Sequence, residues 1–256
     1  TKEIEFQIPL ELIKKQFDGN LLNLIGKDVD LLVTPTHQIL HTYSSTKKFY
    51  KKEANDIKIP CLIPLNGIIN EYKEDSFYKL LGFSFAEGTF VLRHHKTPGD
   101  EYRSCRVQFH LKSKREIEYI SNLLTDLNYK FNICKDKDTV YIRIYSELGK
   151  RICKFFNGKK EIPKEILKLS ISNMKNFLMG YLHGDGHKYP NLKNFWAFVS
   201  ISKSSIDLLY TISRLVGAIS HKSNRIIFGN YKNSKQQYGC SVNVNNNVNN
   251  STIKEI

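Results

Sequence analysis

The sequence predicts an α+β protein in which two similar halves follow a strand-rich N-terminal segment. An apolar helix followed by strands and a second helix recurs in the same order over 75–165 and 166–256, and both apolar helices end in a similar nonapeptide. The first segment, 1–74, instead carries short apolar runs without a helical period. A repeat this long indicates a pseudo-symmetric pair rather than a solenoid, so we expect three units with these boundaries.

The composition favours a polyanionic partner. With 39 Lys and Arg against 25 Asp and Glu, the net charge is +14, which points to nucleic acid first and to an anionic membrane surface second. A hydrophobic content of 41% excludes wholesale disorder. No apolar run is long enough to span a bilayer, and the N-terminus does not resemble a secretory signal. The five cysteines are odd in number and form no Cys-x-x-Cys pair, which predicts reduced thiols in an intracellular compartment such as cytoplasm, nucleoid or organelle matrix.

The N-terminal segment reads as strands and turns. Its apolar runs lie at Leu31–Val33, Gln38–Leu40 and Ile59–Pro64, broken by Pro, Thr and Lys. Only Ile4–Phe17 has helical spacing, and we expect one short helix there.

The first half opens with a helix over Asp75–Phe85 that Asp75 or Ser76 can cap and Gly88 can end. After extended residues Thr89–Leu92, the stretch Arg103–Lys112 alternates as a strand with one apolar and one polar face. The remaining elements are a helix over Ile117–Leu127, strands at Ile133–Cys134 and Val140–Ile144, and a helix over Leu148–Phe156.

The second half repeats this order and ends in an Asn-rich tail. Its expected elements are helices over Asn173–His183 and Ile206–Val216, strands at Phe195–Ile201, Ile226–Phe228 and Tyr238–Val244, and a frayed end over Asn243–Thr252.

The two apolar helices end alike, in Leu80–Gly88 and Leu178–Gly186, with Gly third, a small residue seventh, an acid eighth and Gly ninth. The third and seventh residues lie four apart, which leaves each helix a stripe with almost no side chain. Two such stripes can pack backbone to backbone. That contact would place the two acids, Glu87 and Asp185, side by side.

Two carboxylates held that close repel each other, and a divalent cation relieves the repulsion. A carboxylate pair that binds Mg²⁺ beside a basic surface suits phosphodiester hydrolysis. The plainer interpretation is that each Gly is a packing residue and each acid only ends a helix. Because the whole pattern occurs twice, each time before similar strands, we favour the functional interpretation. His183 and His187 flank Asp185, and we expect a packing or phosphate-contacting role for histidine there rather than a zinc site.

The nonapeptides resemble the LAGLIDADG motif, and residues 75–256 resemble a single-chain, two-motif LAGLIDADG homing endonuclease. The stretch Asn157–Pro163 is similar to the linker of intein-encoded members. The resemblance implies a saddle of two αββαββα halves, with the motif helices at its centre and the sheets straddling DNA. At the sixth motif position the family often has Asp, whereas Phe85 and His183 stand here.

The activity implied by the resemblance is site-specific cleavage of both DNA strands across the minor groove, which leaves four-base 3′ overhangs. The enzyme would be a monomer that uses Mg²⁺, with Mn²⁺ substituting and Ca²⁺ binding without cleavage, on a target of about 20 base pairs, roughly two turns of duplex. The metal-binding residues would be Glu87 and Asp185, with Ala86 and Gly184 beside them. The family also has a polar or basic residue near the end of the second strand of each half. This catalytic residue falls at Lys112, Ser113 or Lys114 and at Ser202 or Lys203.

The polar face of the Arg103–Lys112 strand is the predicted base-reading surface. Arg pairs with guanine and Gln with adenine, so Arg106, Gln108 and His110 are the leading candidates. Any single charged residue on a strand face is more often only solvated, yet 187–256 carries nine Lys or Arg against two acids, and binding should weaken steeply with salt. The further candidates are Arg93, Lys96, Arg103, Tyr141 and Arg143 in the first half, and Lys188, Lys193, Trp196, Ser200, Asn230, Lys232, Lys235 and Gln237 in the second.

The stretch Thr34–His37 resembles the Thr-x-x-His block of inteins and related Hint domains, where the His activates a scissile peptide bond. Splicing also needs a Cys or Ser nucleophile, for which Thr1 is a poor substitute, and a C-terminal His-Asn, which is absent. We therefore interpret the segment as a Hint-derived remnant or a DNA-contacting extension without self-splicing. Two alternatives to an endonuclease remain on the same fold: an RNA-binding intron maturase and a catalytically silent DNA-binding regulator.

Overall fold

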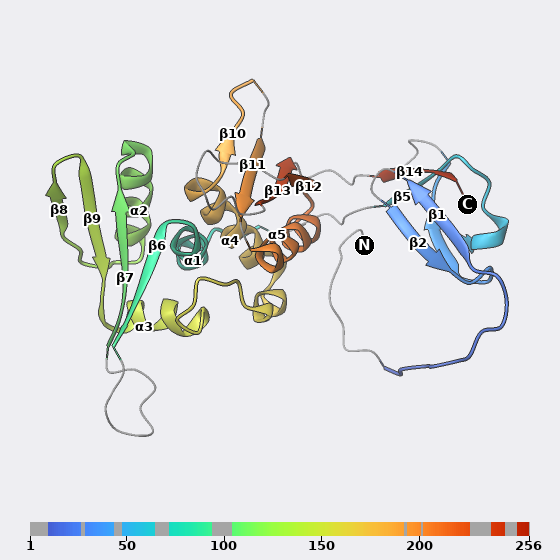
Figure 1. Ribbon diagram of the computed structural model, residues 1–256, viewed down its shortest axis with the longest axis horizontal. Helices are drawn as coiled ribbons and strands as arrows, with labels where there is room; N and C mark the ends of the chain where they lie inside the picture. Colours follow the sequence, from blue (N-terminus) through green and yellow to red (C-terminus); the bar gives the residue numbers. More distant parts are fainter. Residues whose placement is uncertain are drawn as a thin grey trace, which may run out of the picture.

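The structure, a computed structural model, describes residues 10–26, 29–43, 48–64, 72–93, 104–191, 194–200, 202–225, 237–243 and 250–255. Helices and small antiparallel sheets form a mixed α+β fold (Figure 1), as the sequence predicts. Within these ranges no helix has both the length and the apolar character that crossing a membrane requires.

The first half is a four-stranded antiparallel sheet with three helices. It begins with α1 (Ser76–Glu87), and the Asp75 carboxylate caps that helix by accepting hydrogen bonds from the backbone N–H groups of Phe77 and Tyr78. The sheet has the strand order β6-β7-β9-β8. The elements after α1 are β6 (Gly88–Arg93), β7 (Ser104–Leu111), α2 (Lys114–Asp126), β8 (Ile133–Asp136), β9 (Thr139–Ile144) and α3 (Ser146–Phe155).

The second half repeats the same arrangement after a short 3₁₀ turn, η2 (Lys164–Lys168). Its sheet order, β10-β11-β13-β12, places first, second, fourth and third strands as the first half does, which confirms the internal repeat. Among the described residues no helix follows its fourth strand. The elements are α4 (Ile171–Gly184), β10 (His187–Lys188), β11 (Phe195–Ser200), α5 (Lys203–Leu215), β12 (Ile219–Arg225) and β13 (Gln237–Asn243).

Strand alternation separates core from open surface in each half. In β7, Val107, Phe109 and Leu111 are buried, whereas His110 is exposed. In β9, Val140, Ile142 and Ile144 are buried and Arg143 is exposed. Since helix α3 packs against β7, the buried residues face the helices. The opposite side, which we call the open face, carries Arg106, Gln108, His110, Tyr141 and Arg143.

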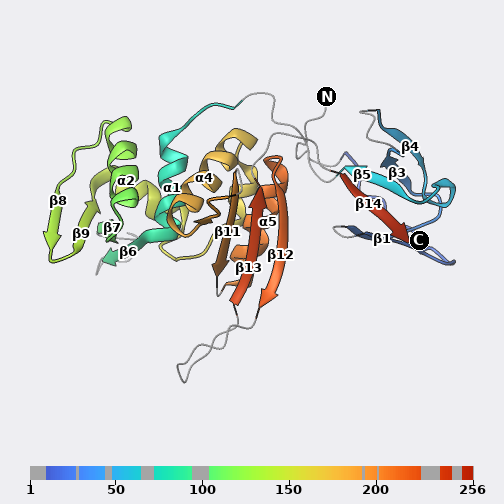
Figure 2. The same cartoon turned by 90° about the horizontal axis from the view of Figure 1, so that it is seen from above.

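Helices α1 and α4 pack together at the centre, between the two sheets (Figures 1 and 2). A Cβ added at Gly82 would lie 2.7 Å from the backbone nitrogen of Tyr181 and would overlap the carbonyl oxygen of Phe177. A Cβ added at Gly180 would lie 2.9 Å from the Cα of Lys79. The two backbones therefore touch where the sequence predicts side-chain-free stripes, and that prediction is confirmed.

The N-terminal segment forms a separate small β unit that a C-terminal strand completes. Strand β14 (Asn250–Glu255) pairs antiparallel with both β1 and β5, which gives the order β2-β1-β14-β5. Leu24, Ile39, Ala54, Ile57 and Cys61 form its own small core. Figures 1 and 2 show this unit at the opposite end of the molecule from the first half. Its other elements are β1 (Leu22–Gly26), β2 (Val29–Val33), β3 (Gln38–His41), β4 (Tyr50–Glu53), a 3₁₀ turn (Ala54–Asp56) and β5 (Cys61–Pro64).

The segment that enters α1 is fixed to α4 of the other half. Tyr72 Oη donates a hydrogen bond to Asn176 Oδ1 at 2.8 Å, and Asn176 Nδ2 donates to the Lys73 carbonyl oxygen at 2.8 Å. The backbone of Lys73 also exchanges two 2.9 Å hydrogen bonds with the Ser172 hydroxyl. Because Asn176 is fully buried, its hydrogen bonds are shielded from water.

Several expectations differ from the structure. The described part of the expected helix Ile4–Phe17 contains none, and its apolar side chains are exposed. Of the expected frayed end, 244–249 lies outside the described residues, and the end of that stretch belongs to β14. The expected strand Ile226–Phe228 also lies outside them, whereas β12 was missed because its sequence is polar. Cys153 is disulfide-bonded, contrary to the expectation of five reduced thiols, while Cys61, Cys134 and Cys240 are free.

Candidate active site and DNA surface

The two motif acids meet where α1 and α4 end. Glu87 is the last residue of α1, and Asp185 is the C-cap of α4. A Cβ added at Gly184 would lie 3.1 Å from Glu87 Cγ and 3.6 Å from Glu87 Oε1. Because the glycine next to Asp185 is in contact with Glu87, the close packing of the helices brings both carboxylates into one small region.

The electrostatics of this region are those of crowded acids. Asp185 keeps an exposed surface, but desolvation by the surrounding protein, followed by the negative charge of Glu87, raises its pKa to about 6, against the lowering effect of Lys160. Burial and then the charge of Glu87 also raise the pKa of Glu116, a residue of the first turn of α2. Glu116 in turn raises the pKa of Asp185. Three carboxylates therefore influence one another electrostatically in this region, and sequence reasoning identified two of them.

Lys160 reaches this site from the segment after α3. Its Nζ donates a 2.6 Å hydrogen bond to the carbonyl oxygen of Ala86, the residue before Glu87. A cation at a helix C-terminus is favourable because the last carbonyls carry partial negative charge. Sequence analysis did not assign Lys160 a role, although it singled out the surrounding stretch Asn157–Pro163 as similar to a family linker.

Arg115 makes a corresponding contact at the end of α4. Its Nη2 donates a 3.0 Å hydrogen bond to the His183 carbonyl oxygen and lies 3.6 Å from Glu116 Oε1. Each motif helix thus ends against a cation from another element. Only the charged stretch Lys114–Glu116, just before the helix predicted over Ile117–Leu127, could have pointed to Arg115 in the sequence.

The predicted catalytic lysines lie at the expected places near the strand ends but contact neither acid. Lys112 follows β7 and Lys203 begins α5, and both side chains are exposed. Lys114 Nζ lies 3.6 Å from Glu118 Oε1 in an exposed pair within α2. Within the described residues, no hydrogen bond or ion pair joins these lysines to Glu87 or Asp185.

Histidines near the acids pack rather than cluster. The His183 ring stacks on Tyr119, with centroids 4.0 Å apart and an interplanar angle of 9°, and lies beside Trp196. Burial and then the positive charges of Arg115, Lys79 and Lys188 lower the pKa of His183 to about 4. In the part of the chain that the structure describes, no group of three or more His, Cys, Asp and Glu side chains is placed to hold a metal.

The first-half candidates for DNA contact gather on the open face. Gln108 lies opposite Arg143 and His110 opposite Tyr141 in the β7–β9 register, and the Gln108 amide is hydrogen-bonded to the His110 ring. Arg106 is half-buried, and its Nε has no hydrogen-bond partner among the described residues. Arg93 lies on β6, but its side chain is outside the described part of the structure. Lys96 and Arg103 lie outside the described residues altogether.

The structure describes the side chains of only three second-half candidates, Lys188, Trp196 and Ser200. Trp196 is 6% exposed and belongs to the core, so its prediction as a DNA contact is wrong. Lys188 lies over that ring, with Nζ 5.7 Å from the centroid. Ser200 is half-buried, and its hydroxyl accepts a hydrogen bond from Ser202 N. Gln237 begins β13 with its side chain outside the described part, and Lys193, Asn230, Lys232 and Lys235 lie outside it entirely.

Comparison with known proteins gives weak similarity to solved structures. No family model matches the chain, and no curated protein matches it. A variant of I-DmoI in complex with its target DNA and Mn is 16% identical over 65% of this chain and 86% of its own, with a TM-score of 0.47. I-DmoI in complex with DNA and Ca gives 16% identity, 65% and 82% coverage and a TM-score of 0.46.

Full-length DUF199/WhiA from Thermatoga maritima is also similar, with 13% identity over 68% of this chain and 53% of its own and a TM-score of 0.42.

Proposed function

We propose that this protein is a site-specific, divalent-metal-dependent DNA endonuclease of the LAGLIDADG homing type, acting as a monomer. The observation that carries the proposal is the contact between the ends of α1 and α4, which holds Glu87 and Asp185 together between two similar sheets. A net charge of +14 and an open face with Arg106, Gln108 and Arg143 suit a DNA partner.

The residues at the helix ends fit a divalent metal. Desolvation and then the negative charge of Glu87 raise the pKa of Asp185, and a bound cation would offset that negative charge. Glu87 and Asp185 would hold Mg²⁺, with the carbonyl groups of Ala86 and Gly184 as neighbouring oxygen donors. When bound, such a metal lowers the pKa of a coordinated water and stabilises negative charge on the phosphate.

The chain's own cations have a separate task in this proposal. Lys160 and Arg115 already lie at the two helix ends, where the scissile phosphates would lie. Their charges would stabilise the phosphate oxygens as negative charge develops in the transition state. Lys112, Lys114 and Lys203, whose side chains are exposed, would bind the flanking phosphates.

The decisive experiment uses DNA that spans the uninterrupted form of the locus encoding this chain. The protein should cut it at one place in Mg²⁺, leave four-base 3′ overhangs, and bind without cutting in Ca²⁺. Specific binding with no cut in Mg²⁺ or Mn²⁺ would contradict the endonuclease and indicate a silent DNA-binding regulator. Absence of specific DNA binding, together with binding of a host intron RNA, would indicate a maturase.

We further propose that the small β unit is a Hint-derived remnant that does not splice. Its support is the pairing of β14 with β1 and β5, which makes the unit discontinuous in sequence, and the turn at Thr34–His37, where His37 N donates to the Thr34 carbonyl oxygen at 2.9 Å. Incubating a purified fusion of this chain between two reporter proteins tests it. A ligated reporter product would contradict the absence of splicing.

A further inference from the structure

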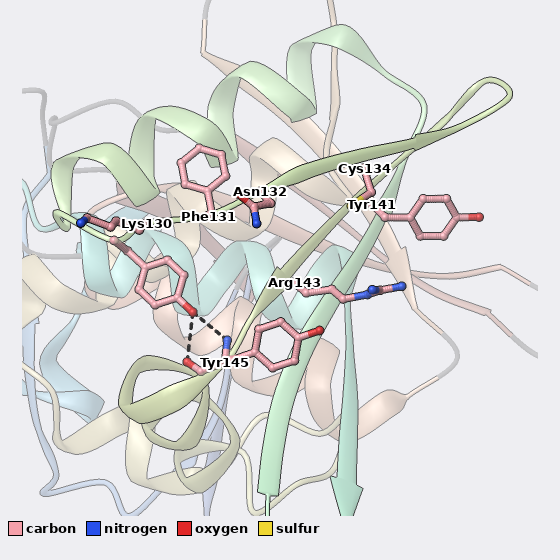
Figure 3. Close-up of a pocket in the computed structure, with 8 residues that line it drawn as sticks. Lys130, Phe131, Asn132, Cys134, Tyr141, Arg143 and Tyr145 are labelled. Carbon is pink, nitrogen blue, oxygen red and sulfur yellow. Dashed lines mark hydrogen bonds between the residues drawn. The ribbon is translucent and has the colours of Figure 1, made fainter.

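A hollow of about 260 Å³ lies on the open face at the β8 edge of the first half (Figure 3). Tyr141 and Arg143 of β9 and Tyr145, the residue after that strand, point to the same side at its rim, while Phe131 and Asn132 come from the segment between α2 and β8. None of these residues belongs to the cluster around Glu87 and Asp185, so the hollow is separate from the candidate active site.

One wall of the hollow is fixed by two hydrogen bonds. Tyr129 Oη donates to the Tyr145 carbonyl oxygen at 3.1 Å and accepts from Tyr145 N at 2.8 Å, as the dashed lines in Figure 3 show. The ring of Tyr129 therefore bridges the segment before β8 and the residue after β9. Because both bonds go to the Tyr145 backbone, the Tyr145 side chain, which is 46% exposed, remains available to a ligand.

The chemistry of the lining suits a planar, partly polar ligand. Four aromatic rings surround the space, those of Tyr129, Phe131, Tyr141 and Tyr145. The Asn132 amide offers both a donor and an acceptor, as the edge of a nucleobase requires. A phosphate alone would need cations but no ring, so the rings indicate a base rather than the DNA backbone.

The position of the hollow connects it to the predicted base-reading residues. Arg143 lies in register with Gln108, and Tyr141 with His110, whose ring contacts it edge-on at 4.7 Å. DNA that contacts Gln108 and His110 would therefore pass beside the hollow. Arg143 and Lys130 at the rim could bind the phosphates on either side of a base that has entered it.

We propose that this hollow binds a single unpaired nucleobase of DNA lying across the open face. The inference rests on the proposed DNA-binding function and deepens it. Proteins that bind an unstacked base hold it by stacking on aromatic rings and by hydrogen bonds to its edge. Bound in this way, the base would add affinity wherever the duplex is bulged, mismatched or easily unstacked.

The test compares three DNA duplexes of otherwise identical sequence, measured by fluorescence anisotropy in Ca²⁺. One is fully paired, one carries a single bulged 2-aminopurine, and one carries an abasic analogue at the bulge. Since the two bulged duplexes differ only in the presence of the base, the ratio of their dissociation constants measures the contribution of that base. The protein should bind the 2-aminopurine bulge about tenfold more tightly than the abasic bulge, the effect expected of one stacked base. The fluorescence of the 2-aminopurine should be quenched when the protein binds.

Two changes at the hollow should abolish that tenfold ratio. Tyr145→Leu removes one ring while keeping the backbone bonds to Tyr129, and alkylation of the exposed thiol of Cys134 with a bulky maleimide fills the space. In the variant Cys134→Ser, which lacks the thiol, the same maleimide treatment should leave the ratio of the two dissociation constants unchanged. Gln108→Ala, on the same face but outside the hollow, should weaken binding to all three duplexes and leave the ratio intact.

The outcomes separate the two proposals. Equal affinity of the unmodified protein for both bulges would overturn the nucleobase pocket, even if the fully paired duplex binds well. A tenfold ratio without measurable binding of the paired duplex would support the pocket and contradict the proposed duplex-cutting function. A ratio that survives both Tyr145→Leu and the maleimide would show that the base binds elsewhere and would also overturn the pocket.

Discussion

Lys160 donates a 2.6 Å hydrogen bond from Nζ to the carbonyl oxygen of Ala86, one residue before the first motif acid. The contact places an ammonium group at the end of α1, where it also lowers the pKa of Asp185 against the effects of burial and Glu87. The segment after α3 thus supplies a positive charge to a site that the sequence predicts to be built from acids.

Replacing Lys160 by Met should slow DNA cleavage by about 100-fold or more, because a fixed charge near the reacting phosphate is worth that much in comparable sites. Affinity for target DNA in Ca²⁺ should change little. Single-turnover cleavage rates measure the first effect and filter binding the second. The neighbouring Lys159→Met is the matched control, since the Lys159 side chain makes no hydrogen bond or ion pair among the described residues, whereas Lys160 bonds to Ala86. An equal loss in both variants would show that only overall charge matters.

Glu87→Gln and Asp185→Asn should each abolish double-strand cleavage while DNA binding is kept. Each change removes one of the two carboxylates needed to hold a metal but preserves the shape of the side chain. A gel assay that separates nicked from linear plasmid would show whether one strand is still cut. Unchanged double-strand cleavage by both variants would disprove the assignment of the site.

Gly180→Ala should destabilise the protein by at least about 1–3 kcal/mol, the usual range for overpacking. The added methyl would lie 2.9 Å from the Cα of Lys79 in α1, and this backbone cannot move aside as a side chain could. Urea denaturation followed by circular dichroism measures the change. An Ala variant as stable as the parent protein would mean that α1 and α4 are not in backbone contact.

Asn176→Ala should destabilise the protein by about 2 kcal/mol, because it removes the hydrogen bonds that this fully buried amide makes to two partners on the segment that enters α1. Those partners are the Tyr72 hydroxyl and the Lys73 carbonyl oxygen. Tyr72→Phe, which removes one of these bonds and leaves the other, should lose only about 1 kcal/mol. Equal stability of both variants to the parent protein in urea would show that the entry segment does not stabilise α4.

The pH dependence of stability in metal-free protein should carry a contribution from His183. Its pKa is about 4 in the folded state and 6.5 when unperturbed, so between these values the unfolded chain binds more protons. This contribution to stability is therefore complete above pH 6.5 and is lost as the pH falls toward 4. Asp185, whose pKa is raised to about 6, contributes with the opposite sign in part of this window.

The variant His183→Phe isolates the histidine contribution, because Phe occupies the equivalent position, Phe85, in the first helix. Unfolding free energies measured in EDTA across the acid range should fall less steeply with decreasing pH in the variant than in the parent protein. Parallel curves would show that His183 titrates normally in the folded state.

The sequence predicted the paired helices well because their packing is local in origin. A side-chain-free stripe such as that of Gly82 admits few partners other than a second stripe, so the approach of the two helices could be predicted from the spacing of their small residues. The contacts of Lys160 and Arg115 could not be predicted in this way. They depend on the path of connecting segments in space, which leaves no periodic signal in the sequence.

The remaining errors have two causes, the burial of a side chain and strands that the sequence pattern does not mark. Trp196 resembles a DNA-contacting residue in a basic strand, yet it lies on the inward side of β11 and packs beside His183. Strand β12 was missed because it has few apolar residues. Strand β14 forms by pairing with β1 and β5, which lie more than half the chain away in sequence.

That pairing of β14 with β1 and β5 makes the two-half body topologically a loop of the small sheet, since the chain leaves through β5 and returns through β14. The entropy lost on closing a loop grows only slowly with its length. A sheet of this kind can therefore hold a very long insertion between β5 and β14 with little more loss of entropy than a short one. The body could therefore be exchanged for another, or shortened to a simple turn, while the sheet keeps its four neighbouring strands.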